Sequence, residues 1–225
     1  MSAHPPAHSQ RQLHAAPPQA LHLASCARRR DIVVIAASAG GVLALLEIVA
    51  GLPADFETPI AIVLHRTPNP PRLLDKLLSR RCHLRVVEAA TGDALAPRTI
   101  FIAPPNGHLS VRPDSTFVVE DGRRINHLRS SANPLFDSAA EVFGAGVVAV
   151  VLSGTGRNGA RGVAAIKERG GTVLVQNEAT STFFEMPAAA IQTGAVDFVL
   201  PLDQIASALG VLCTPAVPQS STATG

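Results

Sequence analysis

The sequence predicts an α/β fold with a doubly wound, mostly parallel sheet, helices on both faces and an antiparallel hairpin insert. Short apolar runs alternate with amphipathic stretches along most of the chain, which is the order of strands and helices in a parallel sheet. The run Val147–Leu152 is wholly apolar, as a central strand covered on both faces should be. One group of short alternating segments, separated by Pro and Gly, interrupts this order and predicts the hairpin.

The individual elements follow from these patterns. The first strand is a β-branched run that ends at a Gly pair, and the later strands are apolar runs of similar length. In chain order we expect strand 31–37, helix 42–52, strand 59–65, helix 72–81, strand 84–88, insert segments 99–103, 108–112 and 116–120, helix 134–143, strand 147–152, helix 160–169, strand 172–176, helix 186–193, strand 198–200 and helix 202–212.

The chain is long enough for one substantial core. Residues 1–29 are rich in Ala, Pro, His and Gln and lack a sustained period, so they are expected to be a disordered tail. Residues 213–225 are similar in character. The sequence therefore predicts one folded domain over residues 30–212.

Charge, cysteine and hydropathy patterns exclude several classes of protein. The net charge is +2, but four arginines and no acid lie in the first thirty residues, so the rest is slightly acidic and is not expected to bind nucleic acid. Three scattered cysteines, in no metal-ligand spacing, favour a reducing cytoplasmic compartment and no metal site. No apolar run approaches the length of a membrane span, so membrane insertion is not expected. An organelle transit peptide is an alternative interpretation of the arginine-rich tail.

Functional side chains are expected in the loops at the carboxyl ends of the parallel strands. Ser38 follows the first strand on a sharp turn, where Gly40 and Gly41 permit tight backbone geometry. The arrangement is similar to a nucleophile elbow, although it lacks the G-x-S-x-G pattern. His65 ends the second strand and can activate Ser38 if the two strands are neighbours. The alternatives are a Ser38 that caps the helix and a His65 that is only packed.

The third loop, Ser153–Gly159, contains a formal G-x-G-x-x-G with Glu178 about twenty residues later. On paper this is a dinucleotide fingerprint. Such a fingerprint belongs on the first βα turn of its fold, whereas this one lies late in the chain. Dinucleotide binding is therefore the weaker alternative, and no cofactor is expected.

The three loops and four further motifs together resemble the catalytic domain of the chemotaxis-receptor protein-glutamate methylesterases, the CheB family. The likeness extends from residue 31 to about residue 210. Besides the loop Ser153–Gly159, the motifs are Ile35–Gly41 (I-A-A-S-A-G-G), His65–Pro68 (H-R-T-P), Phe101–His108 (F-I-A-P-P-N-G-H), Arg129–Phe136, Gln176–Ala179 (Q-N-E-A) and Met186–Pro187.

The resemblance implies hydrolysis of γ-glutamyl methyl esters on receptor helices, and deamidation of receptor glutamines, by a Ser-His-Asp triad. Ser38 matches the family's nucleophile and His65 its base. The acid lies in the family motif T-G-M-G-N-D-G, where Asn158 stands in place of Asp. The oxyanion and substrate-binding positions implied by the resemblance are Ala39, Thr155 and Gly156.

Asn158 is the most serious departure from the family pattern. The acid of a triad fixes the tautomer of the histidine and stabilises the imidazolium, and its loss costs roughly 10⁴ in kcat in serine proteases. An amide oxygen facing Nδ1–H would still hold the correct tautomer, as in Cys-His-Asn proteases. Slow turnover is therefore expected. Asn133 also replaces a family Asp, and Glu178 is a weaker candidate for a substitute acid.

Two functions remain open at this point. The first is a slow methylesterase that acts, as a monomer, on the methylated cytoplasmic helices of chemotaxis-type receptors. The second is a catalytically silent module that still binds receptor or signalling partners. The 29 residues before the domain are too few for the receiver domain of regulated family members, so phosphorylation control in cis is not expected.

Overall fold

The computed structural model describes residues 30–65, 74–121 and 130–214. Apart from residues 213 and 214, the two predicted tails lie outside these ranges. The main sheet has seven strands in the order β3-β4-β2-β1-β7-β8-β9, and β5 and β6 pair separately. The strands are β1 (Ile32–Ala37), β2 (Ile60–Leu64), β3 (Arg85–Glu88), β4 (Thr99–Ile102), β5 (Gly107–Val111), β6 (Phe117–Asp121), β7 (Val147–Val151), β8 (Thr172–Gln176) and β9 (Phe198–Leu200). The helices are α1 (Gly41–Gly51), α2 (Leu74–Ser79), α3 (Asn133–Phe143), α4 (Ala160–Glu168), α5 (Glu185–Ile191) and α6 (Leu202–Cys213), with short 3₁₀ turns η2 (Gly144–Gly146) and η3 (Glu178–Thr180).

The predicted fold class is confirmed, with one correction in the insert. All neighbouring strands of the main sheet are parallel, and β5 and β6 form the antiparallel hairpin. Segment 99–103 was expected in that hairpin, but β4 pairs in parallel with both β2 and β3. Its four residues are all buried, so this strand is covered on both faces. A segment this short, next to Pro-rich turns, does not show from its pattern which sheet it joins.

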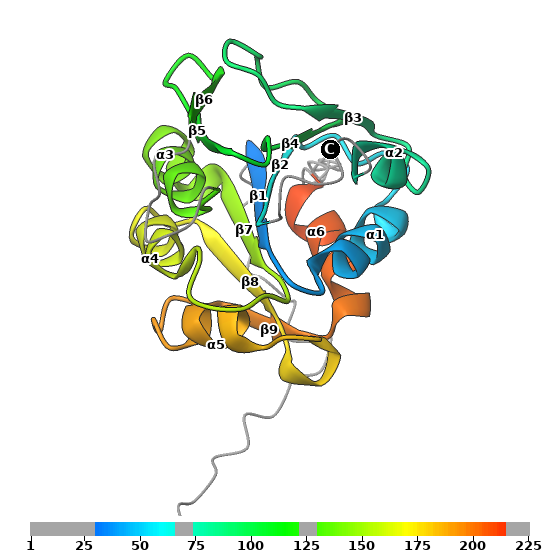
Figure 1. Cartoon of the computed structure of the whole chain (residues 1–225), viewed down its shortest axis with the longest axis vertical. Helices are drawn as coiled ribbons and strands as arrows, with labels where there is room; N and C mark the ends of the chain where they lie inside the picture. The colour runs from blue at the N-terminus through cyan, green and yellow to red at the C-terminus, as the bar shows by residue number, and fades with distance from the viewer. Residues whose placement is uncertain (1–29, 66–73, 122–129, 215–225) are drawn as a thin grey trace, which may run out of the picture.

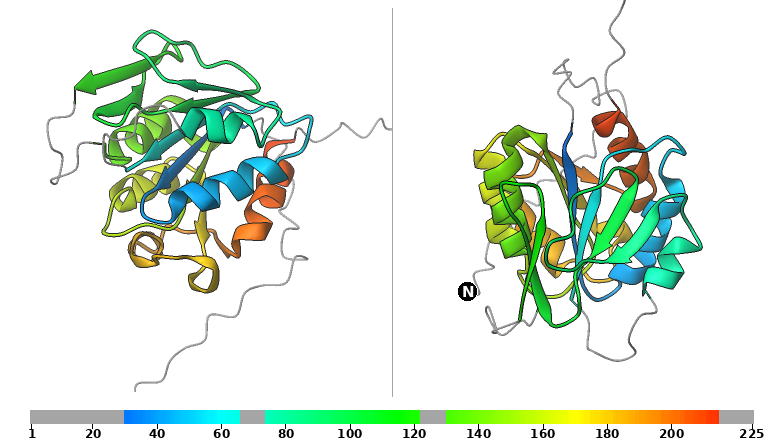
Figure 2. Two further views of the ribbon diagram at one scale, coloured as in Figure 1. Left: turned by 45° about the vertical axis from the view of Figure 1, so that its right-hand side comes forward. Right: turned by 90° about the horizontal axis from the view of Figure 1, so that it is seen from above.

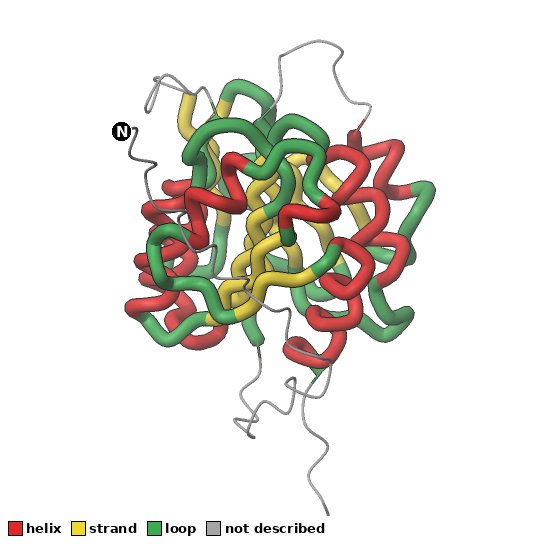
Figure 3. The backbone as a smooth tube through the Cα atoms, turned by 90° about the horizontal axis from the view of Figure 1, so that it is seen from below, coloured by secondary structure: helices red, strands yellow, loops and turns green. Residues whose placement is uncertain are grey.

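Helices cover both faces of the sheet (Figures 1 and 2). Seen along the sheet, the strands run between two helical layers (Figure 3). Successive residues of β1 point to opposite faces, so Val34 and Ala36 pack with α3, α4 and α5, whereas Val33 and Ile35 pack with α1, α2 and α6. Helix α6 extends one residue beyond its predicted end, because Cys213 packs partly buried against the second of these clusters.

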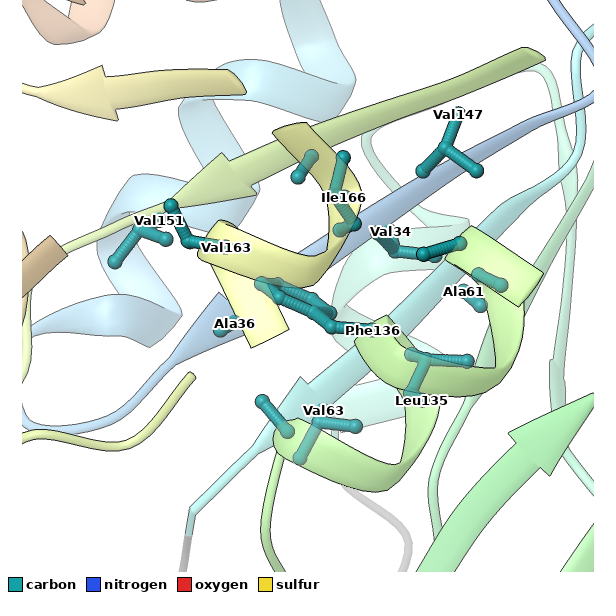
Figure 4. Packing of buried hydrophobic residues seen from close by; sticks show 14 of the residues in the cluster. Val34, Ala36, Ala61, Val63, Leu135, Phe136, Val147, Val151, Val163 and Ile166 are labelled. Atoms are coloured by element: carbon teal, nitrogen blue, oxygen red, sulfur yellow. The ribbon is translucent and has the colours of Figure 1, made fainter. Parts of the chain in front are cut away.

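Phe136 occupies the centre of the core between α3, α4 and the sheet (Figure 4). Its side chain is fully buried. Helix α4 approaches it so closely that a Cβ added at Gly162 would lie 2.4 Å from Cβ of Phe136. The close packing of α3 against α4 therefore requires the Phe136 side chain to lie directly against Gly162.

We predict that Phe136→Ala lowers the free energy of unfolding by about 3–5 kcal/mol, because it removes a fully buried ring and leaves a cavity. Phe183→Ala is the matched control, since that ring is 42% exposed and its loss should cost less than about 1 kcal/mol. Urea unfolding followed by circular dichroism measures both values. Similar losses for the two variants would contradict the prediction.

The strand order places a topological switch point between β1 and β7. The chain leaves β1 toward β2 on one side, and β7 later pairs with the other side of β1. In open α/β sheets, ligands bind in the crevice at the carboxyl ends of such strands. Ser38 follows β1 and the loop Ser153–Gly159 follows β7, so both lie at this crevice. No described helix is long and apolar enough to cross a bilayer.

Candidate functional site

Strand register brings Ser38 and His65 together. Strands β1 and β2 pair in parallel with Ala37 opposite Leu64, so the next residue of each strand lies beside the other. The amide of His65 donates to the carbonyl of Ala37 at 2.9 Å, which continues the ladder to this point. Ser38 Oγ then lies 3.4 Å from Nδ1 of His65. The predicted juxtaposition of Ser38 and His65 is present in the structure.

The geometry of Ser38 suits a nucleophile better than a helix cap. Gly40, not Ser38, is the N-cap of α1, and this position makes no side-chain capping bond. Ser38 Oγ bonds to the imidazole instead, at a distance that is long for an O–H···N bond. Catalytic hydrogen bonds are often long in free enzymes and shorten when substrate binds. The side chain of Ser38 is 8% exposed, so the hydroxyl lies at the edge of the interior.

The described cysteines offer no competing nucleophile. Cys82 and Cys213 are free thiols, each partly buried. Burial raises the pKa of the Cys82 thiol and raises that of Cys213 to about 11. Both thiols are therefore protonated near neutral pH, and the thiolate is the reactive form.

Two backbone amides beside Ser38 have no acceptor among the residues that the structure describes: those of Ala39 and Thr155. The residue after the nucleophile and a second loop supply the two N–H groups of an oxyanion hole in nucleophile-elbow enzymes. Loop 153–159 approaches Ser38 closely, because a Cβ added at Gly154 would lie 2.8 Å from its Cβ. Ala39 and Thr155 are thus available as donors.

Gly156 differs from the other two predicted donors. Its amide donates to a carboxylate oxygen of Glu185 at 2.8 Å. This amide is already paired in the structure, so it is not free to bind a substrate oxygen unless Glu185 moves. Sequence reasoning did not identify Glu185, because nothing in its local pattern indicates a contact with a loop almost thirty residues earlier.

Asn158 lies in the same loop but makes different contacts from those expected of a triad member. Its Oδ1 accepts hydrogen bonds from the Ala132 amide at 2.9 Å and from Ser131 Oγ at 3.2 Å. Its Nδ2 donates to the Ser130 carbonyl at 3.5 Å. No bond joins Asn158 to His65 among the described residues. The line of hydrogen bonds from Ser38 through His65 to Asn158 is therefore only half present.

Asn158 nevertheless lies on the correct side of the sheet. Alternation along β1 and β2 continues from Ala36 and Val63, which face α3, to Ser38 and His65. Asn158 is 5% exposed and bonds at the N-terminal end of α3, on that same face. The buried residues around it form a polar network that continues to His108, whose Nδ1 accepts from the Ser131 amide at 3.1 Å. The sequence places His108 in a motif but does not indicate this role.

The other two acidic or amide candidates have local roles. Glu178 is exposed in η3 after β8, and three strand spacings separate β8 from β2, or about 14 Å. It is therefore poorly placed to serve His65. Asn133 is buried, and its Oδ1 accepts from the Gly162 amide at 3.1 Å, which ties α3 to α4. The described residues contain no group of three potential metal ligands.

The glycines of loop 153–159 have structural reasons that do not require a dinucleotide. Gly159 is the N-cap of α4 and has a φ of 88°, in the left-handed region that favours glycine. Gly154 packs against two side chains, because a Cβ there would lie 2.3 Å from Sδ of Met186 as well as 2.8 Å from Cβ of Ser38. The loop approaches Ser38 this closely only because Gly154 lacks a side chain.

We predict that Gly154→Ala destabilises the protein by about 1–3 kcal/mol, because the new methyl group overpacks a filled space. Gly156→Ala is the matched control in the same loop. It has a φ of 80°, but an added Cβ would meet nothing within 4 Å, so backbone strain of about 1 kcal/mol is its only cost. Urea denaturation compares the two, and a larger loss for Gly156→Ala would contradict the assigned crowding.

Fold and site together define a class: an α/β protein with a parallel sheet and with a serine beside a histidine at the switch point of that sheet. Residues 33–209 match the family model of the CheB methylesterases. The chain therefore belongs to the CheB methylesterase family, and the resemblance inferred from its motifs is confirmed.

Individual relatives agree with this family. The chain is 41% identical over 179 residues to protein-glutamate methylesterase/protein-glutamine glutaminase 2 of Caulobacter vibrioides, covering 78% of this chain and 52% of that protein. It is 40% identical over 193 residues to the protein-glutamate methylesterase FrzG of Myxococcus xanthus, covering 86% and 58%. The chain thus spans a little over half the length of these two relatives.

The comparison with solved structures gives the same result. The crystal structure of the Thermotoga maritima CheB methylesterase catalytic domain matches with a TM-score of 0.77 and 34% sequence identity. The match covers 82% of this chain and 100% of that one. The fold of this chain is therefore that of the CheB catalytic domain.

Proposed function

We propose that this chain hydrolyses γ-glutamyl methyl esters on helical segments of chemotaxis-type receptors, and deamidates glutamines there, with Ser38 as nucleophile and His65 as base. The observation that carries the proposal is the 3.4 Å approach of Ser38 Oγ to Nδ1 of His65 in a chain of the methylesterase family. The reaction needs no metal or cofactor. We further propose that the protein acts in the cytoplasm as a monomer.

The chemistry follows from these positions. Ser38 gives its proton to His65 as its oxygen attacks the ester carbonyl, and the resulting oxyanion accepts hydrogen bonds from the Ala39 and Thr155 amides. Collapse of the intermediate breaks the ester C–O bond and releases methanol, which takes the proton from His65. Water then hydrolyses the acyl-enzyme by the same steps and leaves a glutamate. For these reaction steps, Nδ1 of His65, which faces Ser38, must be unprotonated at the start. The neutral imidazole then carries its proton on Nε2.

Slow turnover is part of the proposal. The imidazolium formed during attack is normally stabilised by a carboxylate, and in this chain the corresponding position holds a neutral amide bonded elsewhere. The same feature supports a second candidate function, a silent module that binds receptor segments without hydrolysing them.

A helical peptide with one γ-glutamyl methyl ester tests both functions. The proposed enzyme releases methanol from this peptide, and ammonia from a matched peptide with glutamine at that position. Absence of both products, with the peptide still bound, would favour the silent module. Absence of both products and of binding would remove both functions.

A further inference from the structure

Ser153 is only 1% exposed, and each of its polar groups makes a hydrogen bond within the protein. Its Oγ donates to the Ala39 carbonyl at 2.8 Å and accepts from the Phe183 amide at 3.0 Å. Its backbone carbonyl accepts from the Ser38 amide at 3.0 Å. Its own amide donates to Oε1 of Gln176 at 2.8 Å. None of these groups remains for a substrate, so any role of Ser153 in catalysis must act through its neighbours.

The neighbours of Ser153 include both ends of the turn that carries the nucleophile. The Ser38 amide and the Ala39 carbonyl are both bonded to Ser153, and the Ser38 carbonyl accepts from the Gly41 amide at 2.9 Å. The Ala39 amide lies between these three fixed points and has no acceptor in the described part of the chain. The turn is therefore held in place with one N–H left unpaired.

The close contact between the turn and Ser153 also explains Gly40. This residue has a φ of 77°, and a Cβ added there would lie 2.7 Å from Ser153 Oγ. Glycine thus allows the turn to lie directly against the hydroxyl.

The same hydroxyl connects the turn to the opposite wall of the site. It accepts from the Phe183 amide, and the Phe183 carbonyl accepts from the Gly154 amide at 2.9 Å. The Gly154 carbonyl in turn accepts from the Met186 amide at 2.9 Å. Thr155, which offers the other unpaired amide, follows Gly154 directly. One buried side chain therefore links the backbone that carries both amides.

We infer that Ser153 is a positioning residue, whose hydroxyl fixes the Ser38–Ala39 turn so that the Ala39 N–H points at the developing oxyanion. The inference rests on the proposed ester hydrolysis. A fixed donor acts on the transition state more than on the bound substrate, so its loss lowers kcat and leaves KM almost unchanged. Gln176 supports the same residue from behind through the Ser153 amide.

The test compares three variants. Ser153→Ala removes the hydroxyl and should lower kcat for the methyl-ester peptide about 10- to 100-fold, with KM changed less than about threefold. Ser153→Thr keeps the hydroxyl and introduces the residue that the family motif has at this position. Its kcat should stay within about threefold of the wild type. Ser138→Ala is the matched control. That hydroxyl likewise accepts from an amide, Val111 at 3.0 Å, and donates to a carbonyl, Pro134 at 2.7 Å, but it lies on α3 away from Ser38. Its loss should leave kcat unchanged.

A second measurement does not depend on turnover. In ¹H–¹⁵N spectra of the full chain, Ser153→Ala should shift and broaden the Ala39 and Gly40 amides, whereas Ser153→Thr and Ser138→Ala should leave them in place. Wild-type kcat in Ser153→Ala, or unaltered Ala39 and Gly40 signals, would overturn the inference. If the wild type itself releases no methanol, the proposed function fails, and the spectra alone decide whether Ser153 fixes the turn.

Discussion

Replacing Ser38 with alanine is expected to lower methyl-ester hydrolysis by about 10²-fold, to the level that binding and the oxyanion donors alone provide, because a chain without the triad acid already lies close to that level. The reason is that the hydroxyl of Ser38 forms the covalent intermediate, and no described thiol is ionised to replace it. Methanol release from the esterified peptide, measured in single-turnover and steady-state assays, gives the ratio to the wild type.

The fold should survive this change, because the one bond of Ser38 Oγ within the described part of the chain is to the His65 ring. We expect a change of less than about 1 kcal/mol in unfolding free energy. Ser181→Ala is the control at the same edge of the sheet: its hydroxyl donates to the Asn177 carbonyl at 2.7 Å and has no part in the proposed reaction. Ser38→Ala/His65→Gln should be no slower than Ser38→Ala alone, since residues that act as a unit are not additive. Hydrolysis retained by Ser38→Ala would exclude the serine mechanism.

Strand neighbours were the part of the site that the sequence could predict. Ser38 and His65 meet because consecutive parallel strands joined by one helix pair directly, and both residues follow their strands at the same register position. The periodicity of each run was also enough to place the helices and most strands. Thr99–Ile102 was assigned wrongly, because four residues carry too little pattern to separate a buried parallel strand from a hairpin segment.

The partners of side chains far from this ladder could not be predicted. Whether Asn158 contacts His65 or α3 depends on where the N-terminal end of α3 packs after the hairpin, and no local pattern records that position. The contacts of Glu185 with Gly156, and of Ser153 with Ala39 and Phe183, likewise depend on the packing of three separate loops. Short-range patterns predicted that Ser38 and His65 lie together, whereas the residues that hold them came only from the structure.

The second large effect is expected from Asn158→Asp, which should raise kcat at least about tenfold, with roughly 10⁴ as the upper bound for restoring a directly bonded triad acid. A carboxylate at this position brings a negative charge to the face of the sheet that carries His65, and that charge stabilises the imidazolium formed in the transition state. The gain should appear in kcat rather than KM. Before the proton transfer, the His65 ring of the proposed mechanism is neutral, so the added charge stabilises the bound substrate complex little.

The surroundings of Asn158 are suited to a carboxylate. The Ala132 amide and Ser131 hydroxyl already donate to Oδ1 and would donate to a charged oxygen more strongly. The N-terminal end of α3 favours negative charge at this point. The second oxygen would replace Nδ2 and lose only the long bond to the Ser130 carbonyl. Ser130 Oγ is buried, has no partner among the residues that the structure describes, and can rotate to donate to that oxygen.

Asn177→Asp is the matched control for the charge. Its Oδ1 also accepts from one amide and one hydroxyl, those of Thr180, at 3.1 and 2.8 Å, but β8 lies three strands from β2. A tenfold rise in Asn158→Asp, none in Asn177→Asp, and loss of the rise in Ser38→Ala/Asn158→Asp would place the new charge in the same reaction as the serine. Equal rates for Asn158→Asp and the wild type would mean that a charge at this position does not stabilise the His65 imidazolium. The slow turnover would then need a different cause, and the paired amide of Gly156 is the next feature to change.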